Sequence, residues 1–544
     1  MSTTATASPG STPGTVTAAA PAVTIGALLD HAALSWPDRV AVVGSDATLT
    51  YGELAASVRR LSAALHHAGV RRGDRIGLWL PNSAFWLQAH AALARLGAVA
   101  VGINFRYPVR EVTRIAAAAG IAALVIDPAA DGAAGAAALS ELAAVPDLEV
   151  RAVLSASGPV PVPEGWTCWD GSDFLTFAGN VPAEADPAAP CTVFPSSGST
   201  GSPKLIAHSQ AGIAAHSAAV ARAFGYDRED AVVLGQLPLC GVWGFNTVYG
   251  AIAGGATAVL MQRFDAARTV DLIERYRVTS ANGPDLFLRQ LFGAAGQARG
   301  RAASLRSVGF STFSNDGVEL VQWGRRLGVT VFQVYGSSEQ LALMVRRPDT
   351  ASVEERADAG GIPSNPETKL RIRDAVTGML AEPGEAGVLE SRGPNTMLGY
   401  LTPDGVDSSA LTDDGWVRSG DICVLDDSGL RYLSREKDAL RLSGFLVDPR
   451  EIELRIEELD GVEEAQVVGI DTERGPRCVA FVRAADAASF DPGRLLDQCK
   501  ESLASYKVPA RIFPVEDFPR IDGANGPRIQ RKALREMAME RMAK

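Results

Sequence analysis

Short apolar runs alternate with amphipathic stretches along much of this chain, and this alternation limits the folds it can adopt. The apolar run at residues 75–80 is followed by a helical pattern over 83–96 and by a strand-like run at 98–103. Strands that alternate with amphipathic helices favour parallel β-α-β units, in which helices cover both faces of a sheet. The same pattern recurs at residues 122–126, 211–224, 231–236, 257–260 and 329–333. The sequence therefore predicts an α/β fold with parallel sheets.

A second, smaller domain is expected to begin at Asp438. Strand and helix patterns follow at residues 440–447, 449–459, 465–470, 478–482, 492–503 and 512–515. A chain of 544 residues also exceeds one ordinary domain. We therefore predict a disordered leader at residues 1–22, which consists mostly of Ala, Ser, Thr, Pro and Gly, an N-terminal domain at 23–437 and an α+β domain at 438–544.

Charge and cysteine content restrict the partners of the protein. Its formal net charge of −11 argues against a nucleic acid or an anionic membrane as partner. Its six cysteines are scattered, without a Cys-x-x-Cys pair or a Cys/His cluster, which indicates reduced thiols and no structural zinc. No apolar run approaches the length of a membrane-spanning helix. We therefore expect a cytoplasmic protein without membrane insertion.

The stretch at residues 194–204, Phe-Pro-Ser-Ser-Gly-Ser-Thr-Gly-Ser-Pro-Lys, carries the strongest chemical signal in the sequence. A loop of this composition can present backbone N–H groups, hydroxyls and one ammonium to an anion, and its glycines permit close approach. The spacing is not that of a Walker loop. We predict that it binds a polyphosphate through Ser196, Ser197, Gly198, Ser199, Thr200, Gly201 and Lys204.

A second chemical signal follows the apolar run that ends at residue 334. The sequence there is Tyr-Gly-Ser-Ser-Glu, from Tyr335 to Glu339. Open α/β sheets bind their ligands at the carboxyl ends of strands, so these residues are candidates for a site. The ring of Tyr335 could stack on a purine, and the Glu339 carboxylate could hold a Mg²⁺ ion that bridges phosphates.

The stretch at residues 237–246 places aromatic side chains in what the sequence suggests is a Gly-rich turn. Trp243 and Phe245 could line the pocket of a planar ligand, with Asn246 beside them. Plain packing of these rings is the alternative interpretation.

These stretches, in this order, resemble the adenylate-forming superfamily, which includes acyl- and aryl-CoA synthetases, luciferases and adenylation domains. Residues 335–339 match its Tyr-Gly-x-Thr/Ser-Glu motif, and residues 414–421 and 432–438 continue the pattern. The resemblance implies a large N-terminal domain, a mobile C-terminal lid and a hinge at Asp438. It also implies that ATP and Mg²⁺ convert a small acid to an acyl-AMP with release of pyrophosphate, before CoA or an amine attacks as second nucleophile.

The resemblance assigns roles to individual residues. It implies that the Ser/Gly loop and Lys204 contact phosphates, that Glu339 binds Mg²⁺, and that Asp421 and Arg435 contact the ribose. Tyr335, Gly336 and Ser338 would border the nucleotide. Trp243, Phe245, Asn246 and Ser337 would border the acid.

The last motif of the family departs from its usual form here. Family members carry a lysine that reaches the α-phosphate and carboxylate, whereas alignment on the apolar position at Ile529 places Arg528 at that point. Arginine is planar and always charged, so it can still clamp oxygens. Three interpretations stay open: a CoA ligase in which Arg528 substitutes for lysine, a diazotase that activates nitrite for attack by an aryl amine, or a non-catalytic nucleotide-binding protein.

Overall fold

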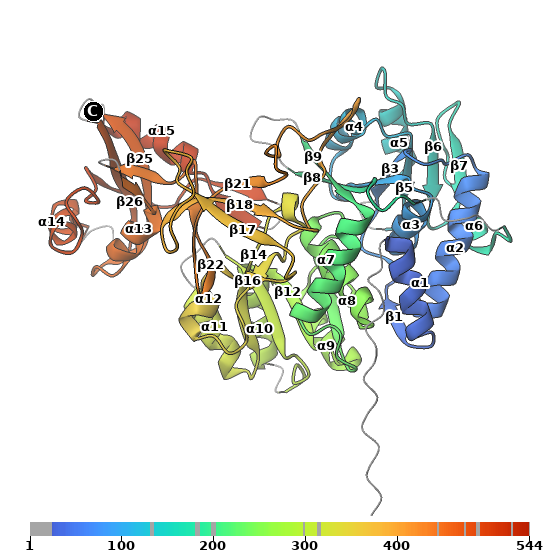
Figure 1. Ribbon diagram of the computed structural model, residues 1–544, viewed down its shortest axis with the longest axis horizontal. Helices are drawn as coiled ribbons and strands as arrows, with labels where there is room; N and C mark the ends of the chain where they lie inside the picture. The colour runs from blue at the N-terminus through green and yellow to red at the C-terminus, as the bar shows by residue number, and fades with distance from the viewer. Residues whose placement is uncertain are drawn as a thin grey trace, which may run out of the picture.

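The computed structural model describes residues 24–130, 135–179, 185–196, 203–297, 300–312, 317–442, 445–472, 475–485, 490–523 and 526–542. Two large sheets with helices form the N-terminal domain, and a smaller group of strands and helices forms the C-terminal domain at one end of the molecule (Figure 1). No described helix is both long enough and apolar enough to cross a membrane.

The first sheet has nine strands, of which six run parallel from β8 to β7. Strand β9 pairs antiparallel with β8, so the Ser/Gly loop connects two neighbouring strands of one sheet. In spatial order the strands are β20 (Gly405–Asp407), β19 (Gly399–Thr402), β9 (Lys204–Ser209), β8 (Pro190–Ser196), β4 (Val99–Gly102), β3 (Arg75–Trp79), β5 (Ala123–Ile126), β6 (Ala152–Ser155) and β7 (Thr167–Asp170).

The second sheet has thirteen strands and is parallel only from β14 to β1. Beyond β14 the strands are antiparallel, and they carry the motifs at residues 414–438. In order they are β17 (Lys369–Arg373), β18 (Ala386–Arg392), β21 (Val417–Asp426), β22 (Gly429–Arg435), β16 (Gly360–Pro363), β15 (Val345–Arg346), β14 (Thr330–Tyr335), β13 (Ser307–Ser311), β12 (Ser280–Pro284), β10 (Val232–Gly235), β11 (Thr257–Leu260), β1 (Val40–Val43) and β2 (Thr48–Thr50).

Helices fill the space between the two sheets and cover their outer faces. The central hydrophobic cluster joins residues of both sheets to α1 (Ile25–Ser35), α2 (Tyr51–His67), α3 (Ala84–Arg95), α7 (Gln210–Ala223) and α8 (Val242–Gly254). The outer clusters involve α4 (Val109–Ala119) and α5 (Ala136–Ala143) on the first sheet, and α9 (Ala266–Tyr276), α10 (Asp285–Gln297) and α11 (Gly317–Arg326) on the second. The short helices are α6 (Gly171–Thr176), α12 (Val353–Ala357) and η1 (Ser338–Gln340).

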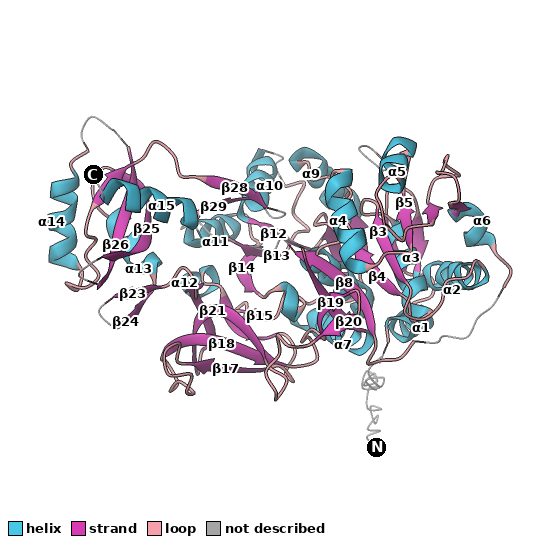
Figure 2. Cartoon of the chain, turned by 90° about the horizontal axis from the view of Figure 1, so that it is seen from above, coloured by secondary structure: helices cyan, strands magenta, loops and turns pink. Residues whose placement is uncertain are grey.

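The C-terminal domain packs helices against a three-stranded sheet. Its elements are β23 (Leu440–Leu442), β24 (Phe445–Val447), α13 (Pro449–Glu457), β25 (Val462–Thr472), β26 (Gly475–Ala484), α14 (Pro492–Ser502), β27 (Ile512–Pro514), β28 (Arg520–Gly523), β29 (Gly526–Ile529) and α15 (Arg531–Met542). The β28–β29 hairpin, which carries the backbone of Arg528, extends from this domain toward the large one (Figure 2).

The predicted α/β fold is confirmed, with three differences. The sheets are parallel only in part, because every strand from β15 to β22 pairs antiparallel. Residues 242–246 begin helix α8 rather than forming a turn, so Gly244 lies where the helix packs closely on the backbone of Leu237 and Pro238. Helix α15 was not predicted, because only Leu534 and Ala538 on it are buried.

Candidate active site

Three motifs that are distant in sequence meet at one edge of the large sheet. Strand β14 ends at Tyr335, whose hydroxyl donates a 2.5 Å hydrogen bond to Oδ2 of Asp421 on β21. Asp421 is opposite Arg435 in the pairing of β21 with β22, and Nη1 of Arg435 lies 3.0 Å from Oδ1 of Asp421. The ring of Tyr335 stacks on Tyr432 with centroids 5.7 Å apart. The structure therefore brings together Tyr335, Asp421 and Arg435 as a connected polar group.

Burial determines the electrostatics of this group. Asp421 is only 2% exposed, and burial raises its pKa whereas the charge of Arg435 lowers it. Burial also raises the pKa of Tyr335 well above its usual value, and the neighbouring Asp421 adds to this effect. The Arg435 side chain is 49% exposed. The Asp421 carboxylate is therefore largely shielded from solvent, while the guanidinium beside it is accessible.

Glu339 lies beside this group, together with a tyrosine that sequence analysis did not select. The Tyr400 hydroxyl lies 3.3 Å from Oε1 of Glu339, and Lys204 Nζ lies 3.5 Å from that hydroxyl and 5.1 Å from the ring centroid. Lys204 and the Glu339 motif, which were predicted to serve the same phosphates, thus share Tyr400 as a neighbour. Tyr400 is the last residue of the Gly-Pro-Asn-Thr-Met-Leu-Gly-Tyr stretch, and nothing in that stretch by itself indicated a site.

A Mg²⁺ ion fits Glu339 as one protein ligand among phosphate oxygens. The described residues contain no group of three or more His, Cys, Asp or Glu side chains that could hold a metal by themselves. Mg²⁺ bound to nucleotides usually needs only one or two carboxylates, with phosphates and waters completing its octahedron. The donor set is therefore suited to a metal that arrives with a polyphosphate.

The backbone after Glu339 is held in a strained turn. Leu341, Ala342 and Leu343 all have positive φ, at 60°, 47° and 45°, a conformation that costs ordinary residues about 1–2 kcal/mol each. A Cβ on Gly336 would lie 2.9 Å from Cα and C of Ala342, so glycine at this position permits the close approach.

Buried polar side chains from β9, α7 and α8 hold this turn in place by donating hydrogen bonds to its backbone carbonyls. Nε2 of His208 donates to the Ser338 carbonyl at 2.8 Å, and Nε2 of His216 donates to the Ala342 carbonyl at 2.9 Å. Burial lowers the pKa of each histidine to about 4, so both are neutral near pH 7. Nδ2 of Asn246 donates to the Leu341 carbonyl at 2.8 Å. Sequence analysis did not identify the two histidines, because a buried histidine usually belongs to the core.

The aromatic candidates differ in their surroundings. Phe245 is fully buried, stacks on Tyr249 at 4.3 Å and meets Trp86, His90 and Phe194 edge-on or tilted in the core. Nε1 of Trp243 is buried without a hydrogen-bond partner among the described residues. Phe245 therefore contributes to packing, and Trp243 keeps an unused donor. Ser337 donates to Oε1 of Gln340 at 3.3 Å.

Part of the predicted phosphate site lies outside the described residues. This applies to Ser197, Gly198, Ser199, Thr200 and Gly201, and to the side chain of Arg528. The two ends of the loop are described: Ser196 and Lys204 are cross-strand partners at the open end of the β8–β9 pair.

Arginines of helix α15 contact the predicted hinge and the core of the C-terminal domain. Nη2 of Arg535 lies 2.9 Å from Oδ1 of Asp438 and donates to the Lys437 carbonyl at 2.7 Å. Arg531 pairs with Glu453 on α13 at 2.8 Å. Helix α15 thus contacts the predicted domain boundary through the ion pair between Arg535 and Asp438.

The fold and these residues define a two-domain α/β protein with a connected group of polar side chains at the edge of its larger sheet where such sheets usually bind ligands. The chain belongs to the AMP-binding enzyme family: that family matches residues 29–401, and its C-terminal domain matches residues 451–523.

Characterised relatives extend over nearly the whole chain. The chain is 32% identical to a (7a-methyl-1,5-dioxo-octahydro-1H-inden-4-yl)propanoyl:CoA ligase of Mycobacterium tuberculosis, over 94% of this chain and 99% of the relative. It is 30% identical to indoleacetate–CoA ligase of Aromatoleum aromaticum, over 90% and 94%. Among solved structures, O-succinylbenzoate coenzyme A synthetase of Bacillus subtilis in complex with AMP matches with a TM-score of 0.73 and 26% identity, over 95% and 98%.

Proposed function

We propose that this protein is an ATP-dependent, AMP-forming ligase that joins a ring-containing carboxylic acid to coenzyme A. In the first step the acid's carboxylate attacks the α-phosphorus of ATP, which gives an acyl-AMP and releases pyrophosphate. In the second step the CoA thiolate attacks the acyl carbon, and AMP leaves. A carboxylate oxygen is a poor leaving group, so attachment of AMP is what makes the second step feasible.

The buried group of Tyr335, Asp421 and Arg435 is the observation that carries this proposal. A carboxylate with two acceptor oxygens suits the two hydroxyls of a ribose, and the exposed guanidinium beside it suits ribose or phosphate oxygens. Three separate motifs supply these residues at the edge of the sheet where a nucleotide is expected.

Lys204 and the loop that precedes it stabilise the negative charge of the departing pyrophosphate. Lys204 is exposed at the start of β9, so its ammonium is free to turn from Tyr400 toward a phosphate. Glu339 would hold a Mg²⁺ ion, which would supply additional neutralisation of charge on the phosphate oxygens.

The identity of the acid is proposed from the relatives. The three proteins compared above are named for acids that carry a hydroindane, an indole or a benzene ring. The unused Nε1 donor of Trp243, on the helix that also carries Asn246, is the described feature that suits a polar group on such a ring.

The proposal is tested by measuring pyrophosphate and AMP release from ATP with a panel of acids, each with and without CoA. Indoleacetate, benzoate and a cinnamate represent the ring-containing class, and butyrate and octanoate represent simple chains. We expect release with at least one ring-containing acid, and a thioester in the mass spectrum only when CoA is present. No release with any acid would overturn the proposal and favour a non-catalytic nucleotide-binding protein.

A nitrite arm of the same assay tests the diazotase alternative, which depends on Arg528 alone. Nitrite with an amino-aryl acid replaces the carboxylate and CoA. Release that requires nitrite, with a diazo product, would replace CoA ligation with diazotisation. In a CoA ligase, Arg528→Lys is expected to raise adenylation of the carboxylate, whereas no gain or a loss would count against an ordinary ligase with a substituted lysine.

A further inference from the structure

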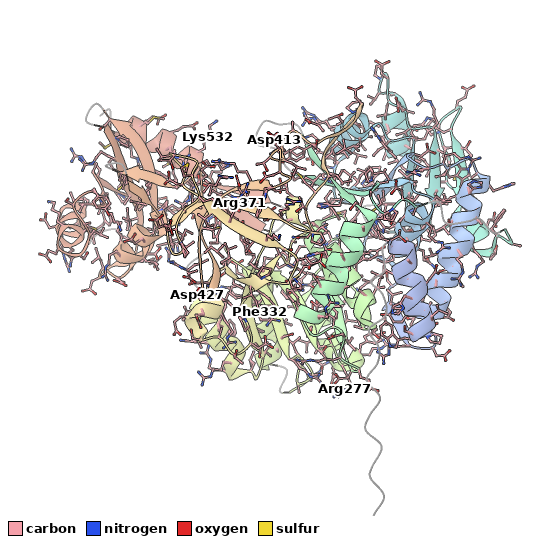
Figure 3. The ribbon with its side chains drawn as sticks, viewed as in Figure 1. Arg277, Phe332, Arg371, Asp413, Asp427 and Lys532 are labelled. Atoms are coloured by element: carbon pink, nitrogen blue, oxygen red, sulfur yellow. The ribbon has the colours of Figure 1, made fainter. Side chains whose placement is uncertain are left out.

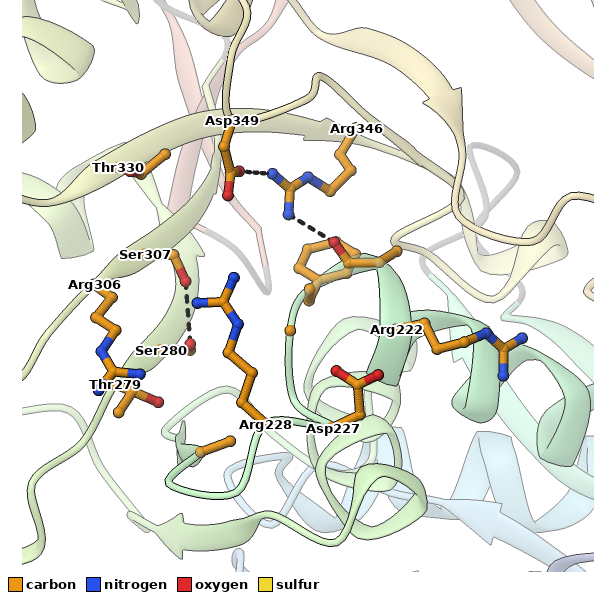
Figure 4. Close-up of a pocket in the computed structure, with 14 residues that line it drawn as sticks. Arg222, Asp227, Arg228, Thr279, Ser280, Arg306, Ser307, Thr330, Arg346 and Asp349 are labelled. Atoms are coloured by element: carbon orange, nitrogen blue, oxygen red, sulfur yellow. Dashed lines mark hydrogen bonds and ion pairs between the residues drawn. The ribbon is translucent and has the colours of Figure 1, made fainter. Parts of the chain in front are cut away.

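A second polar cavity, of about 320 Å³, lies at the other edge of the large sheet (Figure 4). The first residues of three neighbouring parallel strands line it: Ser280 on β12, Ser307 on β13 and Thr330 on β14. Strand β14 thus begins in this cavity and ends at Tyr335, roughly 16 Å away at about 3.3 Å per residue. All lining residues fall between 222 and 349, so the C-terminal domain contributes none of them.

Arginines outnumber acids around this cavity, although the chain as a whole is acidic. Arg222, Arg228, Arg306 and Arg346 line it together with Asp227 and Asp349. Two of the arginines are occupied or directed elsewhere: Arg306 forms a two-point ion pair with Asp230, and Arg222 points away from the cavity (Figure 4). Arg346 is paired with Asp349, so Arg228 supplies the unmatched charge, and Arg346 contributes the N–H groups that its own bonds leave unused.

The Arg346 side chain is buried and fixed in place. Its guanidinium lies 3.8 Å from the ring centroid of Phe332, a residue labelled in Figure 3, and it donates to the Ala223 carbonyl at 2.7 Å. It also donates to the Arg347 carbonyl and to Asp349. These bonds use three of its five N–H groups, so two N–H groups of a preorganised fork remain.

Arg228 is not paired. It makes no hydrogen bond or ion pair with any residue in the described part of the chain, and in Figure 4 its side chain rises toward the pair of Arg346 and Asp349. Gly225 has a φ of 69°, and a Cβ there would lie 3.1 Å from Nε of Arg228, so the glycine leaves room for this side chain. Burial lowers the pKa of Arg346, and the positive charge of Arg228 contributes in the same direction. Two guanidinium groups thus face one cavity, and Asp349 is paired with one of them.

We propose that this cavity binds a small phosphorylated anion between the guanidinium groups of Arg228 and Arg346, with the hydroxyls of Ser307 and Thr330 as further donors. Guanidinium forks match phosphate oxygens in pairs, and the bonds are charge-assisted. Donors from several strands and a loop suit the oxygens of a phosphoryl group better than the two oxygens of a carboxylate. The polar lining makes the cavity unsuitable for an apolar acid. This inference is independent of the reaction proposed above.

The test is equilibrium binding of inorganic phosphate to the purified full-length protein, by isothermal titration at low ionic strength with chloride as the ionic control. Arg228→Gln removes the unpaired guanidinium but leaves the predicted phosphate loop at residues 196–204 intact. We expect saturable binding that weakens at least tenfold in Arg228→Gln and weakens less in Arg228→Lys. The matched control is Arg325→Gln, which removes an exposed arginine of helix α11 and should bind phosphate as the unmodified protein does.

Absence of saturable binding, or equal affinity in Arg228→Gln and the unmodified protein, would overturn the proposal. A parallel titration with glycerol 1-phosphate identifies the source of the anion. Binding at least tenfold tighter than that of phosphate would indicate a phosphorylated metabolite, and equal or weaker binding would indicate free phosphate. The melting temperature of each variant without ligand shows whether it is folded, and because Arg228 is exposed we expect no change in it.

Discussion

Two buried carboxylates, one in each domain, are paired with arginine in nearly the same way but differ in how completely they are satisfied. Asp421 in the large domain is 2% exposed and Glu453 in the C-terminal domain is 1% exposed. Their arginine partners lie at 3.0 Å and 2.8 Å. Glu453 also accepts a 2.9 Å bond from the Val467 backbone N–H, and Arg531 in turn donates to the Val467 carbonyl. This pair joins α13, β25 and α15 into one closed network.

The Asp421 pair is open by comparison. Its Oδ1 has only the ion pair with Arg435, which is not a well-aligned hydrogen bond, and the guanidinium beside it is half-exposed. A closed network of a buried pair fixes the packing of a domain, whereas an open pair at a sheet edge retains acceptors for a ligand. The difference supports the proposal that Asp421 binds a ligand, whereas Glu453 stabilises the C-terminal domain, although the two ion-pair distances are similar.

The largest effect is expected at Glu453. Glu453→Ala leaves Arg531 and the Val467 N–H without their acceptor, which typically costs about 3–5 kcal/mol for a buried pair. All eight tryptophans precede Asp438, so hydrogen exchange of β25 and β26 peptides, measured by mass spectrometry, is the appropriate readout. We expect a large loss of protection there and none in β14. The control, Glu458→Ala, removes an exposed surface pair and should leave exchange unchanged.

Asp448 is the N-cap residue of α13 and lies beside this network, and its titration provides a second test of the C-terminal domain. Burial raises its pKa to about 6, a hydrogen bond from the Arg450 N–H opposes this, and nearby Glu453 adds to it. Because the folded state holds the proton more tightly than the unfolded state, its contribution to stability is present below about pH 4. That contribution, which is at most about 3 kcal/mol, is lost as pH rises to about 6.

Asp448→Asn keeps the cap but cannot titrate, so the C-terminal domain of this variant should lose less stability than the unmodified protein between pH 4 and pH 7. Hydrogen exchange of α13 peptides at several pH values, corrected for intrinsic exchange rates, measures this. Asp491→Asn is the matched control, since Asp491 caps the neighbouring helix α14 but is exposed. Parallel pH profiles for Asp448→Asn and the unmodified protein would contradict the assignment.

Asp421→Asn should leave the fold intact and lower catalysis. Loss of the charged acceptor is expected to reduce pyrophosphate release at subsaturating ATP about 100-fold, which corresponds to about 2.7 kcal/mol and to the upper range for bonds to a charged group. The control is Asp413→Asn, at an exposed residue that precedes β21 and is labelled in Figure 3, and it should have no effect. If Asp421→Asn instead lowered the melting temperature of the large domain and left its affinity for nucleotide unchanged, Asp421 would be structural and the contrast with Glu453 would disappear.

Much of this arrangement could be predicted from the sequence, because it depends on local pattern. The strand that ends at Tyr335, the helical pattern over residues 83–96 and the order of the motifs each follow from hydrophobic spacing or from the family resemblance. The convergence of Tyr335, Asp421 and Arg435 required only that their strands lie in one sheet.

The long-range contacts of the site residues could not be predicted from the sequence. His208 and His216 act on backbone carbonyls more than 120 residues away, and nothing local distinguishes them from core histidines. Tyr400 reaches Glu339 and Lys204 because β19 pairs with β9, a long-range pairing that no periodicity encodes. The same holds for the cavity around Arg228, which is formed by the starts of three strands and becomes visible only when the sheet is assembled.

The smallest effect is expected at Tyr335, and it tests how much the hydroxyl that donates to Asp421 contributes to nucleotide affinity. Tyr335→Phe removes the hydroxyl that donates to Oδ2 of Asp421 but keeps the ring stacked on Tyr432. A hydrogen bond to a charged group contributes about 1.5–3 kcal/mol, but Asp421 keeps its ion pair with Arg435, so the KM for ATP should rise only about tenfold, at the lower end of that range. The control is Tyr432→Phe, because that hydroxyl makes no hydrogen bond within the described residues. If Tyr335→Phe abolished activity while Tyr432→Phe did not, the hydroxyl would contact the reacting groups, and the binding role would belong to Tyr335 as much as to Asp421.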